Sequence, residues 1–236
     1  MSSWIKLGLI IPSSNTTMEM EFNKMKNENM TIHTARMRLK KVTAESLIEM
    51  EREAIIEALK LADAKVDIIA YGCTTGSLVK GAEHATEIEE MIREVTGTPA
   101  VATANSVLRA LEKLNVSRIA VATPYTEELN NLEKKFLEEN GIEVVNIIGL
   151  GITDNTIIGS LKPEKAYKLA LKVDKPSAEA IFISCTNFRT IEIIDKLEEK
   201  LNKPVISSNT ATFWDMLRKI GYRGRINKYG KLLKLE

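Results

Sequence analysis

The sequence predicts an α/β fold built from two pseudo-symmetric Rossmann-like lobes, each a four-stranded, mainly parallel sheet flanked by helices. Short apolar runs alternate eight times with longer, charged segments of helical periodicity, which is typical of βα units in a parallel sheet. A pair of turns also recurs, because 61 residues separate Pro12 from Cys73 and also Pro124 from Cys185, with an offset of 112 between the pairs. This repeat of half the chain favours two open sheets over a closed barrel of eight βα units.

The runs that we assign as strands are almost continuously apolar, as expected for strands that are covered on both faces. They span 5–11, 31–37, 67–72 and 99–103 in the first half, and 117–123, 142–148, 179–184 and 203–207 in the second. Helices are expected over 16–28, 43–64, 76–96, 104–115, 126–140, 163–173, 187–202 and 209–220. Thr16 and Glu19 have the spacing of a capping box for the first helix. We expect residues 1–115 to form the first lobe, with 208–236 packing back onto it, and 116–207 to form the second.

Composition argues against several classes of function. The 236 residues carry a formal net charge of +1, which gives no electrostatic case for binding nucleic acid or an anionic membrane. No apolar run approaches the roughly 18 residues of a membrane span, and two cysteines so far apart have no metal-binding spacing. The first residues lack the basic leader of a signal peptide. We therefore expect a cytoplasmic protein with reduced thiols and no metal.

Polar residues follow the predicted strands at the edge where open α/β sheets bind ligands. Ser14 and Asn15 follow the first strand, and Asn155 lies in the loop GITDNTIIG. Both cysteines occupy strand-to-helix turns and are followed by threonine, in YGCTTGS and SCTNFRT. The candidate site residues beside the thiols Cys73 and Cys185 are thus Ser14, Asn15, Thr74, Thr75, Tyr125, Asn155 and Thr186.

These residue types indicate acid–base or nucleophilic chemistry on an anion. A thiol at a helix N-terminus has its pKa lowered from about 8.5 towards neutrality, and two such thiols can serve as acid and base, or as nucleophile and acid. Hydroxyls, amides and backbone N–H groups can hold a carboxylate and the enolate-like charge beside it. The internal symmetry leaves the two thiols interchangeable. Buried packing cysteines, in a non-enzymatic module that binds small anions, are the alternative.

The two cysteine–threonine turns on two βα halves resemble those of the aspartate/glutamate racemase superfamily. Within it, PSSNTTMEMEF at 12–22, DNTIIGSL at 154–161 and SCTN at 184–187 resemble the maleate cis–trans isomerases and their relatives, the arylmalonate decarboxylases. The resemblance covers essentially the whole chain. The cysteine–threonine pairs mark only the superfamily, whereas PSSNTTME together with SCTN is more specific.

The resemblance implies a cofactor-independent isomerase that turns maleate, or a close cis-dicarboxylate, into the trans isomer. Cys73 would be the nucleophile that adds to the double bond, and Cys185 would exchange a proton with the adjacent carbon. Asn15 and Asn155 would grip the carboxylates, and Tyr125 would hydrogen-bond the carboxylate that carries the charge. The small dicarboxylate would be enclosed between the lobes of a homodimer.

Two related reactions stay open at this point. A racemase for aspartate, glutamate or hydantoins also uses two thiols, but no carboxylate in the turn motifs is available for an α-ammonium group, although Asp154 is close in sequence. The decarboxylases share PSSN but keep a thiol only at the second position. The presence of both Cys73 and Cys185 therefore counts against decarboxylation as the native reaction.

Overall fold

The computed structural model describes residues 4–236, whose strands form two four-stranded sheets with the orders β2-β1-β3-β4 and β6-β5-β7-β8. Every pairing within them is parallel. The strands are β1 (Ile5–Pro12), β2 (Met30–Met37), β3 (Ile68–Tyr71), β4 (Ala100–Ala102), β5 (Arg118–Thr123), β6 (Glu143–Gly149), β7 (Ala180–Ile183) and β8 (Val205–Ser207). The predicted fold class is confirmed, all eight strands lie within two residues of their expected bounds, and the sheets do not close into one barrel.

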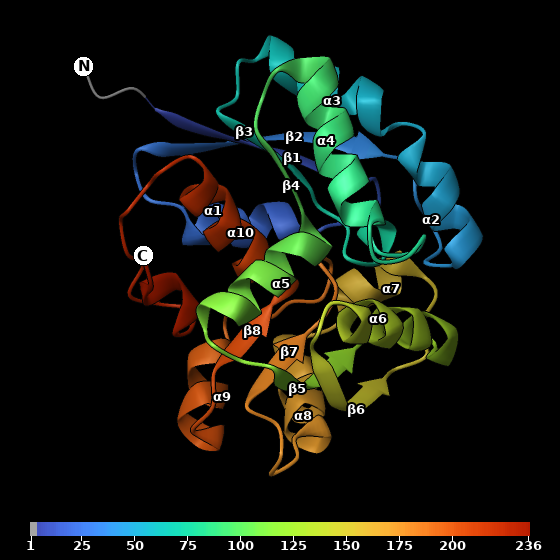
Figure 1. The fold of residues 1–236 in the computed structure, drawn as a ribbon, viewed down its shortest axis with the longest axis vertical. Coiled ribbons are helices and arrows are strands. Elements are labelled where there is room, and N and C mark those ends of the chain that lie inside the picture. The colour runs from blue at the N-terminus through green and yellow to red at the C-terminus, as the bar shows by residue number, and fades with distance from the viewer. Residues whose placement is uncertain (1–3) are drawn as a thin grey trace.

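Helices cover both faces of each sheet, as the continuous burial of the central strands requires. They are α1 (Met18–Met25), α2 (Ala44–Glu51), α3 (Ala54–Asp63), α4 (His84–Thr96), α5 (Thr103–Lys113), α6 (Glu127–Glu139), α7 (Asn155–Ser160), α8 (Pro163–Val173), α9 (Ile194–Leu201) and α10 (Ser208–Lys219), with short 3₁₀ turns η1 (Thr75–Ser77) and η2 (Leu232–Lys234). Figure 1 shows the two sheets towards opposite ends of the long axis, with α5 and α10 between them.

Several helices differ from the prediction, and two of them begin later than expected for a local reason. The expected helix 43–64 is two helices, and the expected 76–96 begins only at His84, because Gly81 adopts a φ of +109° that ends the preceding turn. The expected 187–202 begins at Ile194. In that segment the N–H groups of Thr190 and Ile191 donate to Glu21 Oε1, at 2.6 and 3.2 Å, instead of entering a helix.

The capping box predicted for the first helix is wrong. Thr17 is the N-cap of α1 and makes no capping bond with its own side chain. Oδ1 of Asn15 instead accepts hydrogen bonds from the N–H groups of Thr17 and Met18, at 2.9 and 3.0 Å. Glu19 faces outward and pairs with Arg36. The start of α1 thus fixes the Asn15 side chain at the edge of the first sheet.

The C-terminal region crosses between the halves of the molecule. Asp215 on α10 accepts hydrogen bonds at Oδ2 from Ser106 and Arg109 of α5, both at 2.8 Å. The tail contacts α9, since Asp195 accepts from the N–H groups of Tyr229 and Gly230. Helix α10 begins directly after the last strand and lies between the two sheets in Figure 1. Its first residue, Ser208, accepts hydrogen bonds at Oγ from the Cys185 N–H and from the hydroxyl of Thr74, next to Cys73.

The described residues were also compared with the features of a membrane-spanning helix and of a metal site. Within 4–236, no helix is both long and apolar enough to cross a bilayer. In that range, too, no group of three or more histidine, cysteine, aspartate or glutamate side chains gathers in a way that could hold a metal ion.

Candidate active site

Both cysteines line one small cavity between the carboxyl ends of the two sheets. The atom-free space within it, including its opening to solvent, is about 240 Å³. It contains eight of the nine candidate residues, and Ser14 stands just outside. Its lining is Pro12, Asn15, Leu39, Val42, Cys73, Thr74, Thr75, Tyr125, Asn155, Cys185, Thr186 and Asn187. None of these side chains is a formal cation or carboxylate, so an anion here would be held by amides, hydroxyls and N–H groups.

The Cys73 turn is held tightly against its own strand. The thiol is followed by η1, and hydrogen bonds from the Gly76 N–H and the Thr75 hydroxyl reach its sulfur. A methyl group at Gly76 would lie 3.0 Å from that sulfur and 3.1 Å from the Tyr71 hydroxyl. Only glycine leaves room for this approach, because a Cβ atom does not tolerate such contacts without displacing its neighbours.

The Cys185 turn has a different geometry. Cys185 has a φ of +94°, which is a costly conformation for a residue with a side chain and is often found at functional sites. Its N–H donates to Ser208 Oγ at 3.0 Å, and the Asn187 N–H approaches its sulfur at 3.4 Å. The Tyr125 hydroxyl also bonds the sulfur. These contacts surround the Cys185 sulfur with donors.

The expected lowering of the thiol pKa values is wrong for this enclosed cavity. Burial raises the pKa of Cys73 to about 11 and that of Cys185 to about 12, and the hydrogen bonds to each sulfur offset only part of the effect. Neither thiol lies at the N-terminus of an α-helix, because α4 and α9 begin at His84 and Ile194. Desolvation therefore outweighs the backbone dipoles, and both thiols are protonated at neutral pH.

Amide side chains connect the lobes around the thiols. Asn15 Nδ2 donates to Thr186 Oγ1 at 3.0 Å, and Asn155 Nδ2 donates to Ser14 Oγ at 2.9 Å. Asn187 Nδ2 donates to the Asn155 carbonyl oxygen at 2.7 Å. Ser14 thus holds Asn155 from outside the cavity, and Thr74 Oγ1 donates to Ser208 Oγ at 2.8 Å beneath it.

Some lining residues were not predicted. Asn187 belongs to the SCTN motif, so the sequence did carry a signal for it, but Leu39 and Val42 come from a loop with no motif. That loop crosses to the second lobe, where the Val42 N–H donates to the Thr153 carbonyl at 2.7 Å and Lys41 pairs with Asp154 in an isolated antiparallel bridge.

Arg189 is outside the cavity and pairs with Glu192. Helix α7, which starts at Asn155, was expected to be a loop.

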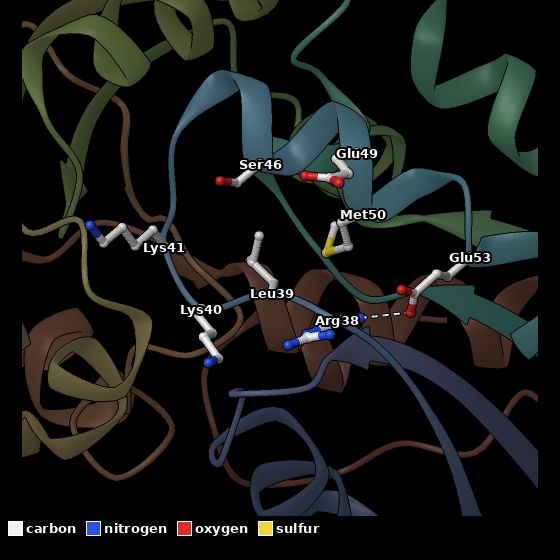
Figure 2. Close-up of a pocket in the computed structure, with 8 residues that line it drawn as sticks. All are labelled: Arg38, Leu39, Lys40, Lys41, Ser46, Glu49, Met50 and Glu53. Carbon is white, nitrogen blue, oxygen red and sulfur yellow. Dashed lines mark hydrogen bonds between the residues drawn. The ribbon is translucent and has the colours of Figure 1, made fainter.

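A larger hollow lies on the other side of the same loop. Figure 2 shows it between the loop and α2, with the Leu39 side chain pointing into it and a hydrogen bond from the Arg38 N–H to Glu53 Oε2. Its volume is about 860 Å³, and it is lined by Arg38, Leu39, Lys40, Lys41, Ser46, Glu49, Met50 and Glu53. It is open and of mixed charge and has no cysteine in its lining, whereas the smaller cavity contains both thiols.

The sequence also matches known proteins. Residues 7–233 match the family model described as arylmalonate decarboxylase. The chain belongs to the arylmalonate decarboxylase family. Within it, a maleate isomerase of Geobacillus stearothermophilus is 30% identical, over 99% of this chain and 98% of that one. The isomerase predicted from the sequence is confirmed by this relationship.

Solved structures of family members agree with the fold. A cysteine-to-alanine variant of the maleate isomerase Iso from Pseudomonas putida S16, with maleate, superimposes with a TM-score of 0.95 at 31% identity and covers 98% of both chains. A cysteine-to-serine variant of the Nocardia farcinica maleate cis–trans isomerase has a TM-score of 0.94 at 25% identity, over 97% of this chain and 98% of that one. That variant carries a covalently bound succinylcysteine intermediate.

Proposed function

We propose that this protein isomerises maleate, or a close cis-dicarboxylate, to the trans isomer without a cofactor. Cys73 is the nucleophile and Cys185 is its acid–base partner. The observation that carries the proposal is the convergence of two thiols, from matching turns of two lobes, on one cavity of about 240 Å³ with uncharged polar walls. The maleate and the succinylcysteine in the two relatives support the same substrate and the same covalent chemistry.

The Cys73 thiol first gives its proton to solvent water, which returns one at the end of the cycle, and the thiolate sulfur bonds to one alkene carbon. The electron pair of the double bond moves to the other carbon, and the neighbouring carboxylate shares the charge as an enolate-like group. The carbon–carbon bond is now single and can rotate. Cys185 gives a proton to the charged carbon and takes it back, the double bond forms again, and the Cys73 thiolate leaves. No atom is gained or lost, so no co-reactant is needed.

The contacts of the two sulfurs support these roles. Asn15 and Asn155 offer amide N–H groups to the two carboxylates, together with the N–H groups and hydroxyls of the threonine turns. Tyr125 bonds the Cys185 sulfur, so it lies where it can donate to the charge-bearing carboxylate next to the protonated carbon. Ser14 orients Asn155. Thr74, Thr75 and Thr186 complete the walls.

The cavity chemistry also disfavours an amino-acid racemase. Among the described residues that line it there is no carboxylate to pair with an α-ammonium group. Asp154, the nearest acidic residue in sequence, uses Oδ1 to accept hydrogen bonds from the Thr156 and Ile157 N–H groups. A dicarboxylate without an amine therefore fits these walls better than aspartate or glutamate.

Proton NMR of the purified protein with maleate and no added cofactor tests the proposal. The parent is expected to produce the fumarate signal, and Cys73→Ala and Cys185→Ala are expected to lose it. Fumarate formation that survives in both variants would refute the two-thiol mechanism. A parent that is inactive on maleate but racemises aspartate, glutamate or a hydantoin, or decarboxylates an arylmalonate, would refute the choice of substrate.

Localisation and assembly belong to the same proposal. The mechanism needs reduced thiols, and both cysteines are free, which supports work in the cytoplasm. Four exposed apolar side chains on α2 and α3, namely Ile48, Ile55, Ile56 and Leu59, support self-association as a homodimer, because such patches commonly mark interfaces. Light scattering on the eluting protein, with Ile56→Lys as the comparison, checks the dimer.

A further inference from the structure

Glu133 is a buried carboxyl group directly behind the thiol cavity. It lies on α6 and is only 1% exposed. Its Oε1 accepts a hydrogen bond at 2.5 Å from Oγ of Ser184, the residue that precedes Cys185. Its Oε2 is also buried, and in residues 4–236 that oxygen has no hydrogen-bond partner. Unpaired buried oxygens are rare because they are costly, so one beside a reactive residue calls for an explanation.

A second, smaller cavity adjoins this carboxyl. It has a volume of about 180 Å³, and its lining is Thr74, Leu78, Ala104, Val107, Glu133, Phe136, Leu137 and Phe182. Thr74 lines the thiol cavity as well, so the two cavities share this residue in their walls. All other lining side chains are apolar, which leaves Glu133 in a dry environment that opposes its ionisation.

The internal repeat supplies a natural comparison. Glu21 precedes Glu133 by the repeat offset of 112 residues and is also completely buried. Its oxygens are well partnered, however, by the N–H groups of Thr190 and Ile191 and by Asn209 Nδ2 at 2.7 Å. Glu133 faces Leu78 and Ala104 instead. At equivalent positions of the repeat, therefore, hydrogen bonds partner both oxygens of Glu21, whereas Oε2 of Glu133 has no partner among the described residues.

The titratable groups that face Glu133 are Tyr125 and Cys185, because a charge on Glu133 raises the pKa of both. Among the described residues, those that line the adjoining cavity with Glu133 are apolar apart from Thr74. Burial raises the pKa of Glu133 to about 7, against a smaller lowering by the Ser184 hydrogen bond. Like charges repel strongly in a dry interior. A charged Glu133 therefore competes with a thiolate at Cys185 and with the substrate carboxylates.

We propose that Glu133 is a positioning residue for the Cys185–Tyr125 pair, and that the isomerase works with this carboxyl in its neutral, protonated form. A neutral Glu133 does not repel the negative charges that the reaction develops beside Cys185. An ionised Glu133 repels them, so activity falls at the alkaline end of the pH range. The kinetic part of this inference rests on the proposed function, whereas the effect on the Cys185 thiol does not.

The variant Glu133→Gln isolates this effect, because the amide has the same shape, stays neutral and keeps an oxygen for Ser184. In a Cys73→Ala background, Cys185 is the only thiol, and its rate of alkylation by iodoacetamide is measured against pH. We expect the added Glu133→Gln change to shift this profile downward by about one pH unit, which is about a tenfold higher rate below the midpoint. With both cysteines present, Glu133→Gln is expected to shift the alkaline limb of kcat/KM for maleate upward.

A matched control is Glu57→Gln on α3, a buried glutamate that pairs with Lys60 and lies outside both cavities. It is expected to leave both profiles in place. Should Glu133→Gln not fold, Ser184→Ala takes its place, since loss of that hydrogen bond raises the pKa of Glu133 and moves the alkaline limb in the same direction. An unchanged Cys185 profile in folded Glu133→Gln, or an unmoved alkaline limb in Ser184→Ala, would overturn the inference. Inactivity of the parent on maleate would instead refute the proposed function and leave the alkylation test intact.

Discussion

Asn15 and Thr186 join the two lobes across the thiol cavity, with Nδ2 of Asn15 donating to Oγ1 of Thr186 at 3.0 Å. The Thr186 hydroxyl donates in turn to the carbonyl oxygen of Gly72, next to Cys73, also at 3.0 Å. The Asn15 Oδ1 atom is occupied by the start of α1. The amide is therefore fixed in orientation, and its second N–H is the group that remains for a substrate carboxylate.

Asn15→Ala is expected to lower kcat/KM for maleate by about a hundredfold, because a preorganised donor to a developing charge is worth this much. Steady-state kinetics on the purified variant measures it. Asn15→Asp is expected to be at least as impaired, since it keeps the cap of α1 and replaces the donor with an anion. A value within about twofold of the parent in either variant would contradict this role.

Cys185→Ser is expected to slow turnover and to accumulate a covalent adduct on Cys73. A serine side chain removes the proton from carbon less readily than the cysteine does, so the succinyl thioether, once formed, persists. Intact-protein mass spectrometry after incubation with maleate should find one added substrate mass, and peptide mapping should place it on Cys73. An adduct on any other residue would rule out the assigned nucleophile.

Gly76→Ala is expected to reduce activity strongly while the protein stays folded. The new methyl group would lie 3.0 Å from the Cys73 sulfur and 3.0 Å from the end of the Met50 side chain, so the sulfur must move. A misplacement of about 1 Å costs about a hundredfold in rate, so a shift of a few tenths of an ångström is expected to cost about tenfold. Kinetics together with thermal unfolding checks this. Unchanged kcat with an unchanged melting temperature would show that the turn accommodates the methyl group without displacing the Cys73 sulfur.

Glu133 should make the stability of the protein depend on pH. Burial raises its folded-state pKa from 4.5 to about 7, so between these values the folded state holds a proton that the unfolded state releases. Stability therefore falls as pH rises through this window, by on the order of 1 kcal/mol per unit, and the loss is complete above pH 7. In Glu133→Gln, urea unfolding should show an advantage over the parent that grows from pH 4.5 to 7 and then levels off. A constant difference would contradict the assigned shift.

Asp215→Ala is expected to destabilise the fold by about 1–2 kcal/mol, because the buried Ser106 hydroxyl loses its acceptor, whereas Arg109 keeps its pair with Glu89. Asp215 holds α10 against α5, and α10 begins with Ser208, whose Oγ accepts from the Cys185 N–H and from Thr74. Chemical denaturation measures the loss. Asp174→Ala removes a carboxylate that is more exposed than Asp215 and pairs with Lys203; it is the control and should cost less.

The sequence carried most of the site because the relevant residues stand beside apolar runs. Strand positions followed from these runs, and the carboxyl ends of parallel strands meet at one edge, which brought Cys73, Cys185 and their threonines together. The loop residues Leu39 and Val42 had no such marker. Their place depends on hydrogen bonds between two segments more than 100 positions apart, such as that from the Val42 N–H to Thr153, and local patterns do not encode such pairs.

By itself, then, the sequence determined the βα repeat, the two-fold character of the chain and the two thiols at matching turns, because each depends on local apolar periodicity and spacing. Only the tertiary structure decided the protonation of those thiols. Their pKa values depend on how completely the lobes exclude water, and burial overrode the dipole effect expected from the turns. Tertiary packing likewise distinguished Glu133 from Glu21, since identical residues in equivalent helices differ only in the partners that distant segments bring to them.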